Sequence, residues 1–120
     1  MKKTETIYTF LFTWYLACDF TYKLAAEAGK PEGQFCYGMQ FFKRKEYAEA
    51  VSWFEKAAEQ EEPDAQTQLG ICYFEGCGVE SNPNLGAWYL YAAADQNWER
   101  AIDIIRENDI PRPTEEEVCL

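Results

Sequence analysis

Histidine, the side chain that most often acts as a catalytic acid or base, is absent from the 120 residues of this chain. Without histidine there is neither a Ser-His nor a Cys-His pair to activate a nucleophile. No C-x-x-C pair offers the usual ligands of a zinc site. We therefore predict a protein that is not an enzyme and that carries no catalytic residue, no metal and no cofactor.

The cysteines are five, an odd number with no regular place in the sequence: Cys18, Cys36, Cys72, Cys77 and Cys119. Such a set does not predict a disulfide framework. Free thiols that pack as small apolar side chains are the simpler interpretation. They indicate a reducing cytoplasm as the place where the protein works.

Acidic residues are plentiful, since 21 Asp and Glu against 11 Lys and Arg give a net charge of −10. Nucleic acid and anionic membranes are poor partners for such a chain, because both repel it. A protein partner with a basic surface is compatible with this charge. The alternative is that acidity only keeps a chain with 17% aromatic residues in solution. Composition favours these two explanations of the acidity, a basic partner and solubility, equally.

The stretch from residue 64 to residue 96 reads as two antiparallel helices joined by a glycine-rich turn. Gly70 lies where a neighbouring helix must come close. In the turn, two glycines can adopt unusual backbone angles, and an asparagine and a proline start the next helix. These four turn residues are Gly76, Gly78, Asn82 and Pro83. GCGV therefore belongs to a helical hairpin and not to a phosphate-binding loop.

The chain repeats itself. AAEQ at 57–60 recurs as AADQ at 93–96, an offset of 36, and AAEA at 25–28 precedes it by 32. Gly38 recurs as Gly70, also at an offset of 32. The difference of four residues falls in the turn between paired helices. A period in this range predicts stacked helical hairpins.

LGICYFEGCGVESN followed by GAWYLYAAADQ resembles the Sel-one-like repeat, a relative of the tetratricopeptide repeat. The residues that fill the pattern are Ala65, Leu69, Gly70, Tyr73, Gly76, Gly78, Val79, Asn82, Ala93 and Ala94. The preceding stretch matches the second helix of the pattern but lacks the glycine turn. The resemblance covers residues 25–106. It implies an adaptor fold without shared catalytic residues.

Residues 1–28 have two interpretations. Two lysines before the run IYTFLFTWYLAC suggest a signal peptide, but Glu5 and the Thr, Tyr and Trp content argue against one. Apolar residues at steps of four and three, with no Gly or Pro, predict one amphipathic helix over 4–28. Its uncharged run is too short to span a membrane. We expect the helix to cap the first repeat, and a homodimer contact or a partner-docking surface is the alternative.

The predicted fold is all-α: a short α-solenoid of stacked antiparallel helix pairs, with a long N-terminal helix and a C-terminal capping helix. The expected helices are 4–28, 31–44, 46–60, 63–75, 82–95 and 97–108. They form one helical-repeat domain over 1–110, with repeats at 31–60 and 63–96. Because Pro111 and Pro113 end regular structure, a flexible acidic tail is expected over 111–120.

These features predict a non-catalytic adaptor, of a bacterial type, that binds a protein or peptide. The alternative is a dedicated inhibitor or immunity-type protein that occludes a basic site on one target. Apolar side chains beyond the packing seam are our candidate anchors: Phe35, Met39 and Phe42. Carboxylates around the turn between the repeats are our candidates for a charged rim: Glu59, Glu61, Glu62 and Asp64.

Overall fold

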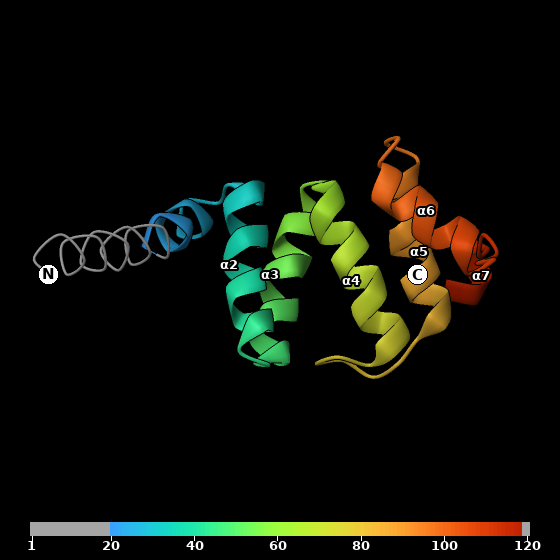
Figure 1. The fold of residues 1–120 in the computed structure, drawn as a ribbon, viewed down its shortest axis with the longest axis horizontal. Coiled ribbons are helices and arrows are strands. Elements are labelled where there is room, and N and C mark those ends of the chain that lie inside the picture. The colour runs from blue at the N-terminus through green and yellow to red at the C-terminus, as the bar shows by residue number, and fades with distance from the viewer. Residues whose placement is uncertain (1–19, 119–120) are drawn as a thin grey trace, which may run out of the picture.

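The computed structural model describes residues 20–118. Within that range every regular element is helical: a segment over residues 20–27, then α2 (Pro31–Lys43), α3 (Tyr47–Glu59), α4 (Pro63–Glu75), α5 (Pro83–Ala94), α6 (Glu99–Glu107) and α7 (Glu115–Val118). The helices stack side by side along the long axis of the molecule (Figure 1). The predicted all-α solenoid is confirmed. Most of the helix expected over 4–28 lies outside the described residues.

The helix boundaries follow local sequence signals. A proline occupies the first position of α2, α4 and α5, where its missing N–H costs nothing. Glu62 accepts a hydrogen bond from Ala65 N at 2.7 Å at the start of α4. Asn82 accepts one from Leu85 N at 3.2 Å at the start of α5. Gly76 ends α4 with a left-handed φ of +73°.

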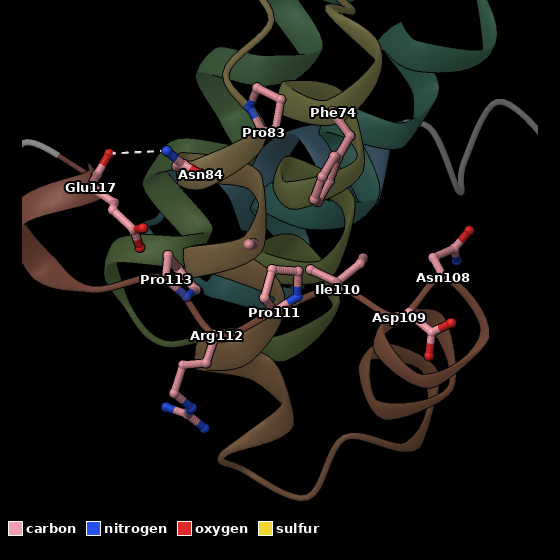
Figure 2. A pocket seen from close by; sticks show the side chains of 11 residues that line it. Phe74, Pro83, Asn84, Asn108, Asp109, Ile110, Pro111, Arg112, Pro113 and Glu117 are labelled. Carbon is pink, nitrogen blue, oxygen red and sulfur yellow. Dashed lines mark hydrogen bonds between the residues drawn. The ribbon is translucent and has the colours of Figure 1, made fainter.

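The C-terminal segment differs from the prediction. Regular structure does not end at Pro111, because α7 follows and its Val118 is only 5% exposed. Thr114 and Glu117 form a capping box in which each side chain accepts from the other's backbone N–H, at 3.3 and 2.8 Å. The Asn84 amide donates to the backbone carbonyl of Glu117 at 3.3 Å (Figure 2). α6 ends at Glu107, before the prolines, and the capping box starts another helix after them.

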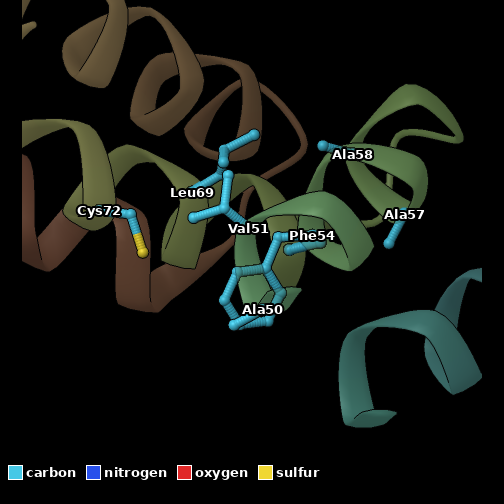
Figure 3. Close-up of a cluster of buried hydrophobic side chains, with 8 residues drawn as sticks. Ala50, Val51, Phe54, Ala57, Ala58, Leu69 and Cys72 are labelled. Atoms are coloured by element: carbon cyan, nitrogen blue, oxygen red, sulfur yellow. The ribbon is translucent and has the colours of Figure 1, made fainter. Parts of the chain in front are cut away.

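The core lies mainly between the two hairpins. α2 pairs with α3, α4 pairs with α5, and α3 packs against α4. Eight buried residues of α3 and α4 form one cluster (Figure 3): Ala50, Val51, Phe54, Ala57, Ala58, Ala65, Leu69 and Cys72. A second cluster joins α5 to α6 through Leu90, Ala93 and Ala101. Full burial of a side chain such as Phe54 or Leu69 stabilises the fold by roughly 1.5–3 kcal/mol.

Two glutamines tie the hairpins to the links between them. Gln60 donates from Nε2 to Gly29 O at 2.9 Å and to Oε1 of Gln34 at 2.8 Å. Gln96 makes the corresponding two bonds one hairpin later, at 2.9 and 2.8 Å. The residue that supplies the carbonyl has a left-handed φ each time, +85° at Gly29 and +61° at Glu61. The repeated sequence therefore produces a repeated hydrogen-bond pattern.

Candidate protein-binding surface

The three predicted anchors lie on α2 against the first core cluster. Phe35, Met39 and Phe42 are all half-buried and pack on this cluster. The ring of Phe35 is 5.8 Å from that of Phe54, centroid to centroid. Phe42 lies 5.1 Å from the ring of Tyr47 in an edge-on arrangement. Each side chain therefore packs in the interior of the first hairpin and leaves only part of its surface for a partner.

Carboxylates gather around the thiol of Cys36. Burial raises the pKa of Cys36, and three nearby carboxylates raise it further: Glu62, Asp64 and Glu32. The pKa of Glu62 is also raised, first by burial and then by Asp64 and Glu32, against a hydrogen bond from Ala65 N that lowers it. We call Glu32, Glu62 and Asp64 the acidic cluster. These carboxylates raise the pKa of the half-buried Cys36 thiol, and the nearby cation Lys43 opposes them.

The other two predicted carboxylates lie elsewhere. Glu61 is exposed, and its carbonyl accepts the hydrogen bond from Gln96. Glu59 belongs to the surroundings of Tyr89, whose pKa is raised by burial first and then by nearby groups that include Glu59. The ring of Tyr89 stacks on that of Tyr73 at 5.8 Å between centroids. The predicted rim is thus divided between two places.

The first helices of the two hairpins and the following helix α6 share one position that carries charge. Glu32, Asp64 and Arg100 are each the second residue of their helix, in α2, α4 and α6. Arg100 donates from Nη2 to Oε1 of Gln68 at 3.3 Å, which joins α6 to α4. The residue at this position is acidic in both hairpins and basic in α6. A bound chain that followed these three residues would need basic groups toward α2.

Sequence reasoning missed Glu32, Cys36 and Arg100. The repeat offsets contained a signal for two of them, because Glu32 precedes Asp64 by 32 residues and Arg100 follows it by 36. Nothing in the sequence distinguished the thiol of Cys36 from the others. Its significance depends on which helices come together.

A cavity of about 330 Å³ opens between α5 and the C-terminal segment (Figure 2). Phe74, Ala87 and Ile110 supply apolar lining, and Asn84 and Glu117 lie at its polar side. None of our predicted site residues except Pro83 lines it. The hydroxyl of Tyr91 donates to the carbonyl of Ile110 at 2.8 Å. Nearby, Arg112 pairs with Asp95 at 2.6 and 3.2 Å.

Stacked helix pairs whose first helices both begin with proline, and which share link geometry and buried small residues, define a helical-hairpin repeat protein. The Sel1 repeat model matches residues 33–62 and 63–98, more than half of the chain, and the protein belongs to the Sel1 repeat family. No curated protein matches the chain. Sel1 repeats are generally non-catalytic modules for protein–protein interaction. Over the part of the chain that the structure describes, none of the helices has the length and apolar character to cross a membrane.

Proposed function

We propose that this chain is an adaptor that binds a basic segment of another protein at the acidic cluster. The observation that carries the proposal is that Glu32 and Asp64 occupy the second position of successive first helices, with Glu62 capping the start of α4 beside Asp64. Two of these carboxylates come from different first helices, and the third comes from the link before α4. A lysine or arginine of the partner would relieve their mutual repulsion and supply charge-assisted hydrogen bonds.

The net charge of −10 supports the same type of partner. An acidic protein attracts a basic one over several ångströms, and this attraction raises the association rate more than the lifetime of the complex. The half-buried anchors on α2, which are Phe35, Met39 and Phe42, would then contribute apolar contact through the parts of their side chains that remain exposed. A dedicated inhibitor would use the same charge but would form one tight, stoichiometric complex.

The experiment is affinity capture from the native cell, followed by binding kinetics with each captured protein. The test variant is Glu32→Gln with Asp64→Asn, which removes two charges from the acidic cluster. The control is Glu80→Gln with Glu107→Gln, which removes two charges from exposed positions elsewhere. We expect the test variant to slow association and to weaken its salt dependence, and the control to change both much less.

Phe42→Ala examines the apolar contribution, and we expect it to speed dissociation of the complex. Circular dichroism first shows whether this variant is folded. A captured protein whose binding ignores the acidic-cluster variant would reject the proposed site. An acidic partner, or a nucleic acid, would reject the electrostatic argument itself. One partner in a fixed stoichiometry would favour the inhibitor over the adaptor.

A further inference from the structure

The chain holds one of its own segments against α5. Residues 110–114, IPRPT, follow α6 and have no regular secondary structure, and we call them the proline segment. Figure 2 shows Ile110, Pro111 and Pro113 following one another across α5. A proline fixes its own φ and favours an extended backbone in the residue before it. The two prolines therefore favour an extended, polyproline-like backbone over four successive residues.

Two side chains of α5 contact the proline segment through three interactions. The hydroxyl of Tyr91 donates to the carbonyl of Ile110 at 2.8 Å. The carboxylate of Asp95 accepts two hydrogen bonds from the guanidinium of Arg112, at 2.6 and 3.2 Å. That guanidinium also lies 4.4 Å from the centre of the Tyr91 ring. α5 thus binds a carbonyl that precedes a proline and the arginine that follows it.

A small cavity beside these contacts has aromatic walls. Trp88, Tyr91 and Ala92 line this space of about 160 Å³, and Arg112 and Pro113 form its other side. Grooves lined by aromatic side chains are a recurring way in which proteins bind proline-rich segments. We call the side chains of Trp88, Tyr91 and Asp95 the α5 surface.

The α5 surface is not a general feature of the repeat. The equivalent positions of α3, each 36 residues earlier, carry Ser52, Glu55 and Glu59. An acidic residue is common to both helices at the last of these positions, but the two aromatic residues belong to α5 alone. The first hairpin forms without them, so the repeat itself does not require them. What they contact in α5 is the chain's own proline segment.

The proline segment is held loosely. Arg112 and Pro113 line both the cavity of about 330 Å³ and the one of about 160 Å³, so they pack incompletely on α5. The ion pair is exposed, with 59% of the Arg112 side chain and 58% of that of Asp95 accessible, and such pairs contribute little stability. Of the four residues of α7, only Val118 is buried. A segment held by so few contacts opens more readily than the core.

Charge favours an occupant from another protein. The chain's own segment continues from its one arginine into Glu115, Glu116 and Glu117, which weakens its attraction to a protein with a net charge of −10. An arginine-bearing segment without those carboxylates would be attracted more strongly. We infer that the α5 surface is a binding site for an extended segment of another protein that carries an arginine between two prolines. The proline segment occupies this site until such a segment displaces it.

The test measures binding of a fluorescent peptide, IPRPT with blocked ends, to the full chain by anisotropy. Because the proline segment competes from within the same molecule, we expect the wild-type chain to bind the peptide weakly. Arg112→Ala removes the anchor of this internal competitor and should lower the dissociation constant of the peptide by about tenfold or more. The control is Arg106→Ala, which removes an arginine from another exposed pair, with Asp103, and should leave that constant almost unchanged.

Two further variants locate the site and check the displacement. In the Arg112→Ala chain, Asp95→Asn should weaken peptide binding by about tenfold, because the arginine of the peptide loses its ion pair. A peptide with alanine in place of that arginine should bind as weakly. Thr114→Ala removes the capping box of α7 without changing the α5 surface, and it should also tighten binding of the original peptide. Circular dichroism of every variant checks that the fold is retained.

A peptide that binds Arg112→Ala and Thr114→Ala no more tightly than the wild-type chain would overturn the inference. Binding that ignores Asp95→Asn, or the arginine of the peptide, would overturn it too. A dimer that Arg112→Ala dissociates, in a chain that does not bind the peptide, would make a second copy the occupant and the inferred partner wrong. The acidic cluster shares no residue with the α5 surface, so Glu32→Gln with Asp64→Asn should change peptide binding far less than Asp95→Asn does. Either proposal can therefore fail without the other.

Discussion

The two hairpins belong to one repeat family but bring their helices together differently. In the α4–α5 hairpin, backbone meets backbone: a Cβ on Gly70 would lie 2.8 Å from Gly86 O, and one on Gly86 would lie 2.8 Å from Gly70 O. In the α2–α3 hairpin the glycine faces a ring instead. A Cβ on Gly38 would lie 2.8 Å from Cε1 of Phe54.

The equivalent positions explain this difference. Ala50 and Phe54 of α3 correspond to Gly86 and Leu90 of α5, each 36 residues later. A smaller pair of residues lets α4 and α5 touch directly, whereas a ring fills the space between α2 and α3. All four positions are buried. The repeat therefore preserves the hairpin arrangement and leaves the type of contact free to vary.

The largest difference should appear when a methyl group is added to each glycine. We expect Gly70→Ala to lower the free energy of unfolding by about 3 kcal/mol, because neither the carbonyl of Gly86 nor its helix can move away easily. Gly38→Ala should cost about 1 kcal/mol, because the ring of Phe54 can tilt. Urea unfolding followed by circular dichroism measures both values. Equal losses would mean that ring and backbone yield to the same extent.

The turns make a second contrast. α2 and α3 are joined by three residues, and the longer link of the second hairpin contains two glycines with the same φ of +73°, Gly76 and Gly78. A Cβ on Gly76 would meet nothing nearer than 3.6 Å, whereas one on Gly78 would lie 2.5 Å from the carbonyl carbon of Tyr47. The additional turn residues therefore touch the start of α3. They support the preceding hairpin as well as reversing the chain.

Substituting valine at each turn glycine separates backbone strain from close contact. Gly78→Val should lower the free energy of unfolding by about 1–3 kcal/mol, because it combines an unfavourable φ with a clash at Tyr47. Gly76→Val has the same φ and no clash, so its loss should lie at the lower end of that range. Thermal unfolding midpoints compare the two variants. If Gly76→Val proved the more harmful, the contact with Tyr47 would be unimportant.

Much of the fold could be predicted because its signals are local. Prolines at the first position of three helices and a glycine after α4 gave boundaries to within a few residues. Gly70 was expected at a close approach, and it is found there. Left-handed residues without glycine, such as Lys45 and Asp109, were not predicted. Both residues are exposed and lie in the turn that ends a helix, where Glu46 N donates to Phe41 O and Ile110 N donates to Ile105 O, each at 3.0 Å. Glycine usually marks such a position in a sequence, and neither position has one. α7 was missed because two prolines outweighed a capping box that was also in the sequence.

The candidate site was harder to predict, because it depends on which helices meet. Aromatic residues beyond one seam suggested exposed anchors, but α2 contacts α3 along a wide face that takes in Phe35 and Phe42. Periodicity cannot separate two partly buried faces on a helix of 13 residues. Carboxylates that are near one another in sequence can have different neighbours: Glu59 lies near Tyr89, whereas Glu62 lies near Asp64 and Glu32. Glu32 joins the acidic cluster from another helix.

The last contrast between the two hairpins concerns the reactivity of their thiols. Cys72 of the second hairpin is 0% exposed, and burial, with smaller effects of Cys77 and Glu75, raises its pKa to about 12. Cys36 of the first hairpin is half-buried, and its pKa is also raised. Only the thiolate reacts with iodoacetamide, so at neutral pH we expect Cys36 to be alkylated much faster than Cys72 in the folded protein.

Peptide mass spectrometry measures the two alkylation rates separately. If Cys72 reacts only when the chain unfolds, its rate follows the population of unfolded molecules. Gly70→Ala should then speed alkylation of Cys72 by roughly tenfold for each 1.4 kcal/mol of stability lost, and should change that of Cys36 far less. Cys72 would be accessible in the folded state if its rate equalled that of Cys36 or ignored Gly70→Ala. The tight contact between α4 and α5 would then not be what protects it.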